Sequence, residues 1–292
     1  MNINKKKIYG LVVLLISYIT AYLAGFTVFN LLKNNVHIYV SLLVADIAAT
    51  IIIYLIGLLY NTASIYDPYW SIQSIIIGIS LTIYTHNINA GIIMFLVIVG
   101  IYSIRLTANF FIGFNDITYI DWRYKMLKEK TGKWYFLVNL FGIHLFPTLV
   151  VYAATLPMIG YISSNMDLKM YDVAGWLIMI IGVIYEIYSD YSIMKYKKIR
   201  KSNKEIINIG LWRYSRHPNY FGEITFWFGV FITFWLHDLG NWYYMFGAVA
   251  ILLMFVFVSI PMQERHLEEY KRDYHSYKLK TRMLIPLKKR KI

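Results

Sequence analysis

Long apolar runs separated by short polar segments dominate the chain. A hydrocarbon core about 30 Å thick is crossed by a helix of about 20 apolar residues, and eight runs approach that length. They are Ile8 to Leu32, Ile38 to Tyr60, Trp70 to Tyr84, Ala90 to Ile112, Trp134 to Ile162, Val173 to Met194, Tyr220 to Leu236 and Trp242 to Pro261. The pattern predicts an all-α membrane protein, a polytopic bundle of about eight transmembrane helices. Because Pro147 and Pro157 interrupt the longest run, we expect a kink or two shorter helices there.

Composition supports the membrane assignment. Hydrophobic residues make up 58% of the 292 residues, which is too much apolar surface for an ordinary soluble domain. The chain has no cysteine, which excludes disulfides, thiolate zinc sites and cysteine nucleophiles, and we predict no metal site. A net charge of +13 is also typical of nucleic-acid-binding proteins, but here the basic residues lie between apolar runs. We therefore expect no nucleic-acid partner.

The distribution of basic residues predicts the orientation. Eight spans place 26 of the 29 Lys and Arg residues on one side, in the segments 1–7, 61–69, 113–133, 195–219 and 262–292. The opposite side holds only Lys33 and Lys169, and Arg105 lies within a span. The positive-inside rule makes the basic side cytoplasmic. We expect both termini in the cytoplasm, with the first run retained as an anchor, in the cytoplasmic membrane if the source is bacterial.

Several ionisable residues lie inside the predicted spans, where each charge costs about 2.5 to 3.5 kcal/mol and needs a partner or a role. Tyr102, Arg105 and Asn109 share one helical face, so Arg105 either snorkels to the headgroups or lines a cavity. Glu186 and Asp190 are four residues apart, and they either pair with the following lysines or accept a ligand hydroxyl.

Two further acidic residues can be explained by structural roles. Asp67 precedes Pro68 at the start of a run, where it caps the helix without excluding a second role. Asp46 has no partner cluster nearby in the sequence, and we interpret it, with His37, as structural.

The most informative stretch runs from Gly210 to Glu223 and reads GLWRYSRHPNYFGE. Arg213, Arg216 and His217 place positive charge beside a predicted helix start, where unpaired N–H groups also attract anions. Asn219, Tyr220 and Glu223 continue the polar character into the span. The stretch predicts a phosphate or headgroup site at the cytoplasmic surface of the membrane.

Further motifs accompany that stretch in a recognisable order. They are Asp67-Pro68-Tyr69-Trp70-Ser71-Ile72, Arg105-Leu106-Thr107-Ala108-Asn109-Phe110, Asp121-Trp122-Arg123-Tyr124, Ser189-Asp190, Pro261-Met262-Gln263-Glu264-Arg265, Tyr274, Tyr277, Arg282 and Ile285-Pro286. In these residues the chain resembles the steroid 5-alpha-reductase superfamily, specifically a bacterial membrane group catalogued as a domain of unknown function. The resemblance covers nearly the whole chain.

The resemblance implies an NADPH-dependent reductase that transfers a hydride to the activated C=C bond of an enone. The substrate would be a lipophilic molecule in the membrane, a steroid or an isoprenoid. The implied cofactor-binding residues are Asp190, Tyr214, Asn219, Tyr220, Glu223, Glu264, Arg265, Tyr274, Tyr277 and Arg282, to which local charge adds Arg213, Arg216 and His217.

The resemblance also indicates catalytic residues. The catalytic tyrosine of the steroid enzymes precedes an arginine by three positions, as Tyr102 precedes Arg105, so Tyr102 is the candidate general acid. Arg105 would orient it or lower its pKa, and Asp67 stands in place of the acidic partner. A hydroxyl held against the substrate carbonyl stabilises the developing enolate by several kcal/mol.

Two other functions stay open. Isoprenylcysteine carboxyl methyltransferases carry a similar Arg-His-Pro-x-Tyr motif, which makes an S-adenosylmethionine-dependent methyltransferase the alternative. A transporter would use Arg105, Glu186 and Asp190 as an ion path. We expect a single membrane domain, with residues 1–133 forming much of the substrate cavity and 134–292 the cofactor site. The expected partners are the substrate and membrane lipid, and no obligate protein partner is evident.

Overall fold

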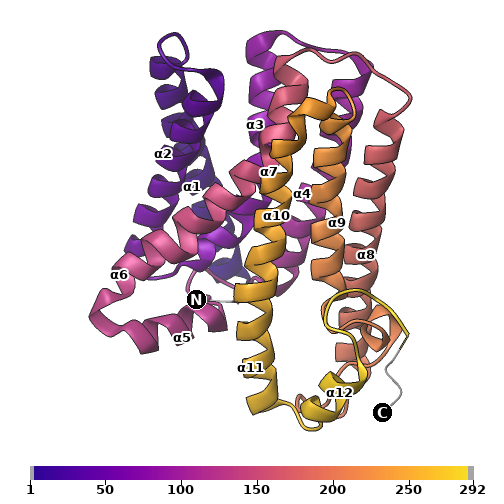
Figure 1. Ribbon diagram of the computed structural model, residues 1–292. Coiled ribbons are helices and arrows are strands. Elements are labelled where there is room, and N and C mark those ends of the chain that lie inside the picture. The colour runs from indigo at the N-terminus through magenta and orange to yellow at the C-terminus, as the bar shows by residue number, and fades with distance from the viewer. Residues whose placement is uncertain (1–2, 289–292) are drawn as a thin grey trace. The chain divides into compact units, whose positions relative to one another are not determined.

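The computed structural model describes residues 3–288, which fold into helices, with one isolated β-bridge between Ser215 and Arg282 (Figure 1). This confirms the all-α prediction. The α-helices are α1 (Ile3–Leu32), α2 (Ile38–Leu59), α3 (Asp67–Thr85), α4 (Ala90–Gly113), α5 (Trp122–Thr131), α6 (Tyr135–Leu137), α7 (Phe146–Ser163), α8 (Asp172–Ile199), α9 (Pro218–Trp235), α10 (Met245–Met254), α11 (Ile260–Tyr270) and α12 (Tyr274–Lys280).

The protein is a multi-pass integral membrane protein. Within residues 3–288, six helical stretches are long and apolar enough to cross a membrane: Lys5–Leu32, Ile38–Leu59, Ala90–Gly113, Trp122–Ser163, Asp172–Ile199 and Leu239–Tyr270. The other two predicted spans correspond to α3 and α9, helices of 19 and 18 residues. The count of eight and the cytoplasmic location of the termini stay predictions, and residues 1–2 and 289–292 lie outside the described residues.

Proline shapes two of the long helical stretches. Pro147 has no N–H for the carbonyl four residues earlier, and the turn before it widens into a π-helix, Val138–Leu145. The same widening, Phe255–Ser259, precedes Pro261. Near Pro147 the structure thus has a π-helix where a kink or two shorter helices were expected, and Pro157 lies inside α7. The last helical stretch continues past Pro261, where the predicted span ends, through α11 to Tyr270, and the end of the span stays a prediction.

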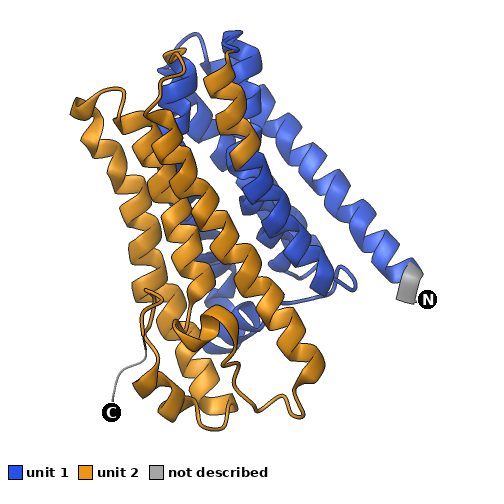
Figure 2. Cartoon of the chain, turned by 90° about the vertical axis from the view of Figure 1, so that its right-hand side faces the viewer, with its two compact units in different colours: residues 1–88, 99–163 blue, residues 89–98, 164–292 orange. Residues whose placement is uncertain are grey.

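The chain forms two compact units, coloured separately in Figure 2. Unit 1 comprises residues 1–88 and 99–163, and unit 2 comprises residues 89–98 and 164–292. In unit 1, α1 packs against α2 and α3 packs against α7. Hydroxyl groups link these helices inside the unit, since Thr148 bonds to Thr50 at 3.0 Å and to Tyr66 at 2.8 Å. Such bonds join helices where lipid offers no polar partner.

In unit 2, glycines bring α8 and α9 into backbone contact. A Cβ atom added to Gly182 would lie 2.6 Å from the carbonyl oxygen of Gly222, and one added to Gly229 would lie 2.6 Å from the backbone nitrogen of Met179. Small residues permit this approach, which van der Waals contact then stabilises in a membrane. The crossing fixes α9 beside the half of α8 that carries Glu186.

We expect Gly182→Ala to destabilise unit 2 by about 1 to 3 kcal/mol, because the added methyl group would collide with backbone rather than with a movable side chain. The measurement is thermal unfolding in detergent. Gly100→Ala is the matched control: its Cβ would meet only the Ile75 side chain, at 3.9 Å, and the gain in helix propensity predicts equal or higher stability. Equal melting temperatures for both variants would contradict the tight crossing.

Candidate functional site

The C-terminal tail is bound along the segment that precedes α9. The backbone N–H of Arg216 donates to the carbonyl of Arg282 at 2.9 Å, beside the β-bridge. The Ser215 hydroxyl donates to the Leu284 carbonyl at 2.6 Å, and the Tyr277 hydroxyl donates to the Trp212 carbonyl at 2.5 Å. The motif and the tail, more than 60 residues apart in the sequence, therefore form one site in unit 2.

An ion-pair cluster holds this site together. The Arg216 Nε lies 2.7 Å from Glu264 Oε1, and Arg216 Nη1 donates to the carbonyls of Lys278 and Thr281 at 2.9 and 2.6 Å. Lys278 Nζ lies 3.1 Å from Glu264 Oε2 and 2.7 Å from Glu268 Oε1, and its bond to Glu268 raises the pKa of Lys278. The Arg216 charge is thus neutralised inside the protein.

His217 and Tyr220 extend the cluster toward α9. The His217 Nε2 lies 3.1 Å from Glu264 Oε1, while burial lowers the pKa of His217. The neutral ring then donates its Nε2 hydrogen to Glu264. The His217 ring stacks on Tyr220, which stacks on Phe255 at a centroid distance of 4.4 Å. These contacts fix the entry of the chain into α9.

Three of the predicted cofactor-binding residues each have a buried polar atom without a hydrogen-bond partner among the described residues. These atoms are Asn219 Oδ1, the Tyr274 hydroxyl and Arg282 Nε. Unpaired buried groups are rare because each costs about 1 to 3 kcal/mol. An acceptor, a hydroxyl and a guanidinium match what ribose hydroxyls and phosphates require. The residues therefore fit a phosphate-bearing nucleotide, and each of the three was predicted from the sequence.

The remaining predicted cofactor residues have varied surroundings. Arg213, Tyr214 and Arg265 are exposed, and Asp190 is half-buried on α8. Glu223 is buried and accepts a hydrogen bond from the Trp227 indole at 2.9 Å. Sequence analysis did not select Lys278 or Ser215. The tail contains several basic residues, so the sequence does not distinguish Lys278 from the others. Only its position beside Glu264 in the structure does so.

The predicted catalytic residues belong to unit 1. Asp67, in the first turn of α3, accepts a hydrogen bond from the Tyr124 hydroxyl at 2.5 Å. Arg123 Nη2 lies 3.9 Å from the same carboxylate, and Arg123 also pairs with Asp121. This arrangement fixes the Asp67 side chain.

The other two predicted catalytic residues lie on α4. Tyr102 is 1% exposed, and Arg105 is half-buried. Asn109 on the same helix is exposed, so the polar face runs from the interior to the surface. Their assignment to catalysis stays a prediction.

Asp46 has partners that the sequence did not indicate. The Tyr69 hydroxyl donates to Asp46 Oδ1 at 3.2 Å, and the Gln73 amide donates to Asp46 Oδ2 at 2.6 Å. Both partners lie on α3, while Asp46 lies on α2. The position of Asp46 within an apolar run indicated that it needs a partner, but the sequence could not identify that partner because Tyr69 and Gln73 are distant in sequence.

Comparisons with known proteins agree with these motifs. The model of a family described as "Protein of unknown function (DUF1295)" matches residues 53–281. Over 112 residues the chain is 29% identical to human 3-oxo-5-alpha-steroid 4-dehydrogenase 1, covering 38% of this chain and 40% of that enzyme. The enzyme of the same name from Macaca fascicularis is 28% identical over 38% of this chain and 39% of its own length. No solved structure matches significantly.

Proposed function

The chain belongs to the DUF1295 family, which is related to the steroid 5-alpha-reductases, and on this premise we propose that it is an NADPH-dependent membrane reductase. The proposed reaction transfers a hydride to the activated C=C bond of a lipophilic enone. The chain spans about 40% of the length of the curated relatives it matches, so the activity is a proposal for this chain. The observation that carries it is the set of unpartnered polar atoms of Asn219, Tyr274 and Arg282.

In this proposal, residues of unit 2 bind the nucleotide. Arg282 binds phosphate, while Asn219 and Tyr274 accept and donate hydrogen bonds at hydroxyl groups of the cofactor. Arg216 acts differently, because Glu264 and two carbonyls already occupy its guanidinium; it holds the tail that carries Arg282. When bound, NADPH would supply the hydride.

In the same proposal, residues of unit 1 supply the proton that completes the reduction. Tyr102, which is almost fully buried, donates its hydroxyl proton to the enolate oxygen that forms when the hydride reaches the beta carbon. Burial excludes water, which strengthens the electrostatic stabilisation of that oxygen. Arg105 orients the tyrosine, and Asp67, fixed by Tyr124, positions the surrounding helices. A substrate dissolved in the membrane suits so apolar a bundle.

The proposal is tested with the purified protein in detergent. We expect NADPH to bind with an increase in its fluorescence, and Arg282→Ala to weaken binding about 10- to 100-fold, the value of a hydrogen bond to a charged group. Arg272→Ala is the matched control, because Arg272 is an exposed arginine of the same tail and should leave the affinity unchanged.

S-adenosylmethionine, measured by calorimetry, should not bind. Binding of S-adenosylmethionine without binding of NADPH would instead establish the methyltransferase alternative. If neither NADPH nor S-adenosylmethionine binds, or if Arg282→Ala and Arg272→Ala behave alike, the assignment of Arg282 to the cofactor is refuted.

A further inference from the structure

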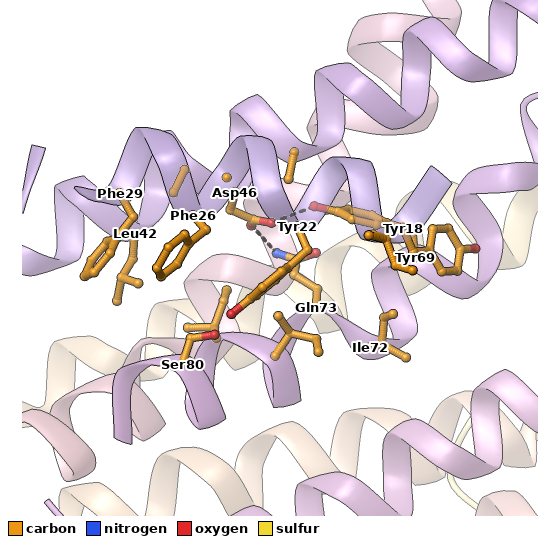
Figure 3. A pocket seen from close by; sticks show the side chains of 16 residues that line it. Tyr18, Tyr22, Phe26, Phe29, Leu42, Asp46, Tyr69, Ile72, Gln73 and Ser80 are labelled. Carbon is orange, nitrogen blue, oxygen red and sulfur yellow. Dashed lines mark hydrogen bonds between the residues drawn. The ribbon is translucent and has the colours of Figure 1, made fainter. Parts of the chain in front are cut away.

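Unit 1 contains a pocket whose lining includes none of the residues assigned above to cofactor or catalysis. Helices α1, α2 and α3 line a half-open pocket of about 330 Å³ (Figure 3). On α1 its lining extends from Tyr18 to Phe29, a rise of roughly 16 Å at 1.5 Å per residue. Apolar side chains form most of the wall, with Phe26, Phe29 and Leu42 at one end and Ile72 toward the other (Figure 3). The pocket is long and apolar.

The buried polar side chains of the pocket lie between these ends. Asp46, Tyr69 and Gln73 line the pocket and are respectively 7%, 8% and 3% exposed. Figure 3 shows Asp46 linked to both partners by hydrogen bonds. The Gln73 amide nitrogen donates to Asp46 Oδ2 and to the Thr148 carbonyl, at 2.6 and 3.1 Å. Its carbonyl oxygen, Oε1, has no hydrogen-bond partner among residues 3–288.

These bonds decide what the pocket offers to a ligand. Both hydrogens of the Gln73 amide are directed at acceptors, so its orientation follows from its partners, and Oε1 is left as an acceptor. Tyr69 uses its hydroxyl hydrogen on Asp46, and the Asp46 carboxylate has lone pairs to spare. The three buried polar side chains therefore present acceptors. The hydroxyls of Tyr22 and Ser80, farther along the wall, can rotate to suit either role.

We propose that this pocket binds an elongated apolar alcohol, whose hydroxyl donates a hydrogen bond to Gln73 Oε1 or Asp46. An unpaired acceptor in an apolar cavity costs free energy, and a ligand hydroxyl removes that cost while its hydrocarbon chain fills the apolar length. A ketone, an aldehyde or an ether brings no donor and leaves Gln73 Oε1 unpaired. Volume and apolar lining are within the usual range for ligand sites.

The proposed ligand differs from the substrate of the proposed reductase. Reduction of an enone needs a donor against the carbonyl oxygen, whereas the three buried polar side chains of this pocket, Asp46, Tyr69 and Gln73, present acceptors. Asp46 and all of α1 also precede residue 53, where the match to the family model begins. The site is therefore a second one, and its existence does not depend on cofactor binding.

The test measures equilibrium binding of tritiated farnesol to the full chain in lipid nanodiscs, without nucleotide. We expect farnesol to compete with the label about tenfold better than farnesyl methyl ether or farnesal, because only the alcohol donates a hydrogen bond. Equal competition by the three compounds would overturn the proposal.

Two tryptophan substitutions on α3 provide the matched test. Ile76 lines the pocket and is 39% exposed, whereas Ile79 is 43% exposed and does not line it. We expect Ile76→Trp to weaken farnesol binding at least tenfold by filling the cavity and Ile79→Trp to leave it unchanged. Equal binding by both variants would refute this location. The compound comparison on the unaltered chain remains decisive if Ile76→Trp fails to fold.

Discussion

Replacing Glu264 with alanine is expected to destabilise unit 2 by about 3 to 5 kcal/mol, the usual effect of removing one partner from a buried ion pair. The change leaves Arg216 buried without its carboxylate and removes the acceptor of His217. Lys278 also loses one of its two carboxylate partners. We expect a large fall in the thermal unfolding temperature in detergent and faster proteolysis within residues 271–288, because the tail loses its anchor.

Glu268→Ala is the matched control for this effect. Glu268 lies one turn farther along α11 and pairs with the same Lys278, but its side chain is 39% exposed. Exposed ion pairs contribute about 0 to 1 kcal/mol. If the two variants unfold at the same temperature, the cluster does not anchor the tail.

Replacing Tyr102 with phenylalanine is expected to reduce the proposed reductase activity about 10²- to 10⁴-fold, the usual range for loss of a general acid. The aromatic ring remains, so packing around this buried position should be preserved. NADPH affinity should stay unchanged, because the nucleotide residues lie in unit 2. The measurement is NADPH oxidation at 340 nm with testosterone and farnesal as enone and enal probes.

Tyr54→Phe separates chemistry from stability. The Tyr54 hydroxyl donates to the Phe136 carbonyl at 3.1 Å in the same unit, so its loss should cost about 1 kcal/mol of stability and leave the rate unchanged. A Tyr102→Phe variant that turns over as fast as the unaltered chain would remove Tyr102 from the catalytic step.

Helix interiors and helix ends differed in how well the sequence predicted them. Long apolar runs located every long helix of residues 3–288, because crossing a bilayer requires an unbroken run of apolar residues. The apolar runs did not show that the helix continues past Pro261 as α11, where the chain changes from apolar to polar. A helix that leaves the membrane keeps its backbone bonds in water, so polarity alone does not end it. The apolar runs also missed α5, because it is a polar helix, capped by Asp121.

Within the candidate site, local motifs predicted which residues gather but not what each one does. Arg216 and Arg282 were both predicted to bind the cofactor. The fold separates them, since Glu264 neutralises Arg216 while Arg282 Nε has no partner among the described residues. That distinction depends on contacts between α11, the tail and the start of α9, which no local pattern encodes.

The sequence by itself determined that this is a helical membrane protein, because lipid imposes long apolar runs that can be read directly from the chain. It also identified the motif and the tail as one candidate site through their resemblance to a reductase superfamily. Only the tertiary structure decided how the buried polar residues are paired. Asp46 had no partner in the sequence, and α3 supplies Tyr69 and Gln73. Hydrogen bonds between helices depend on which faces meet, and those faces are chosen by packing.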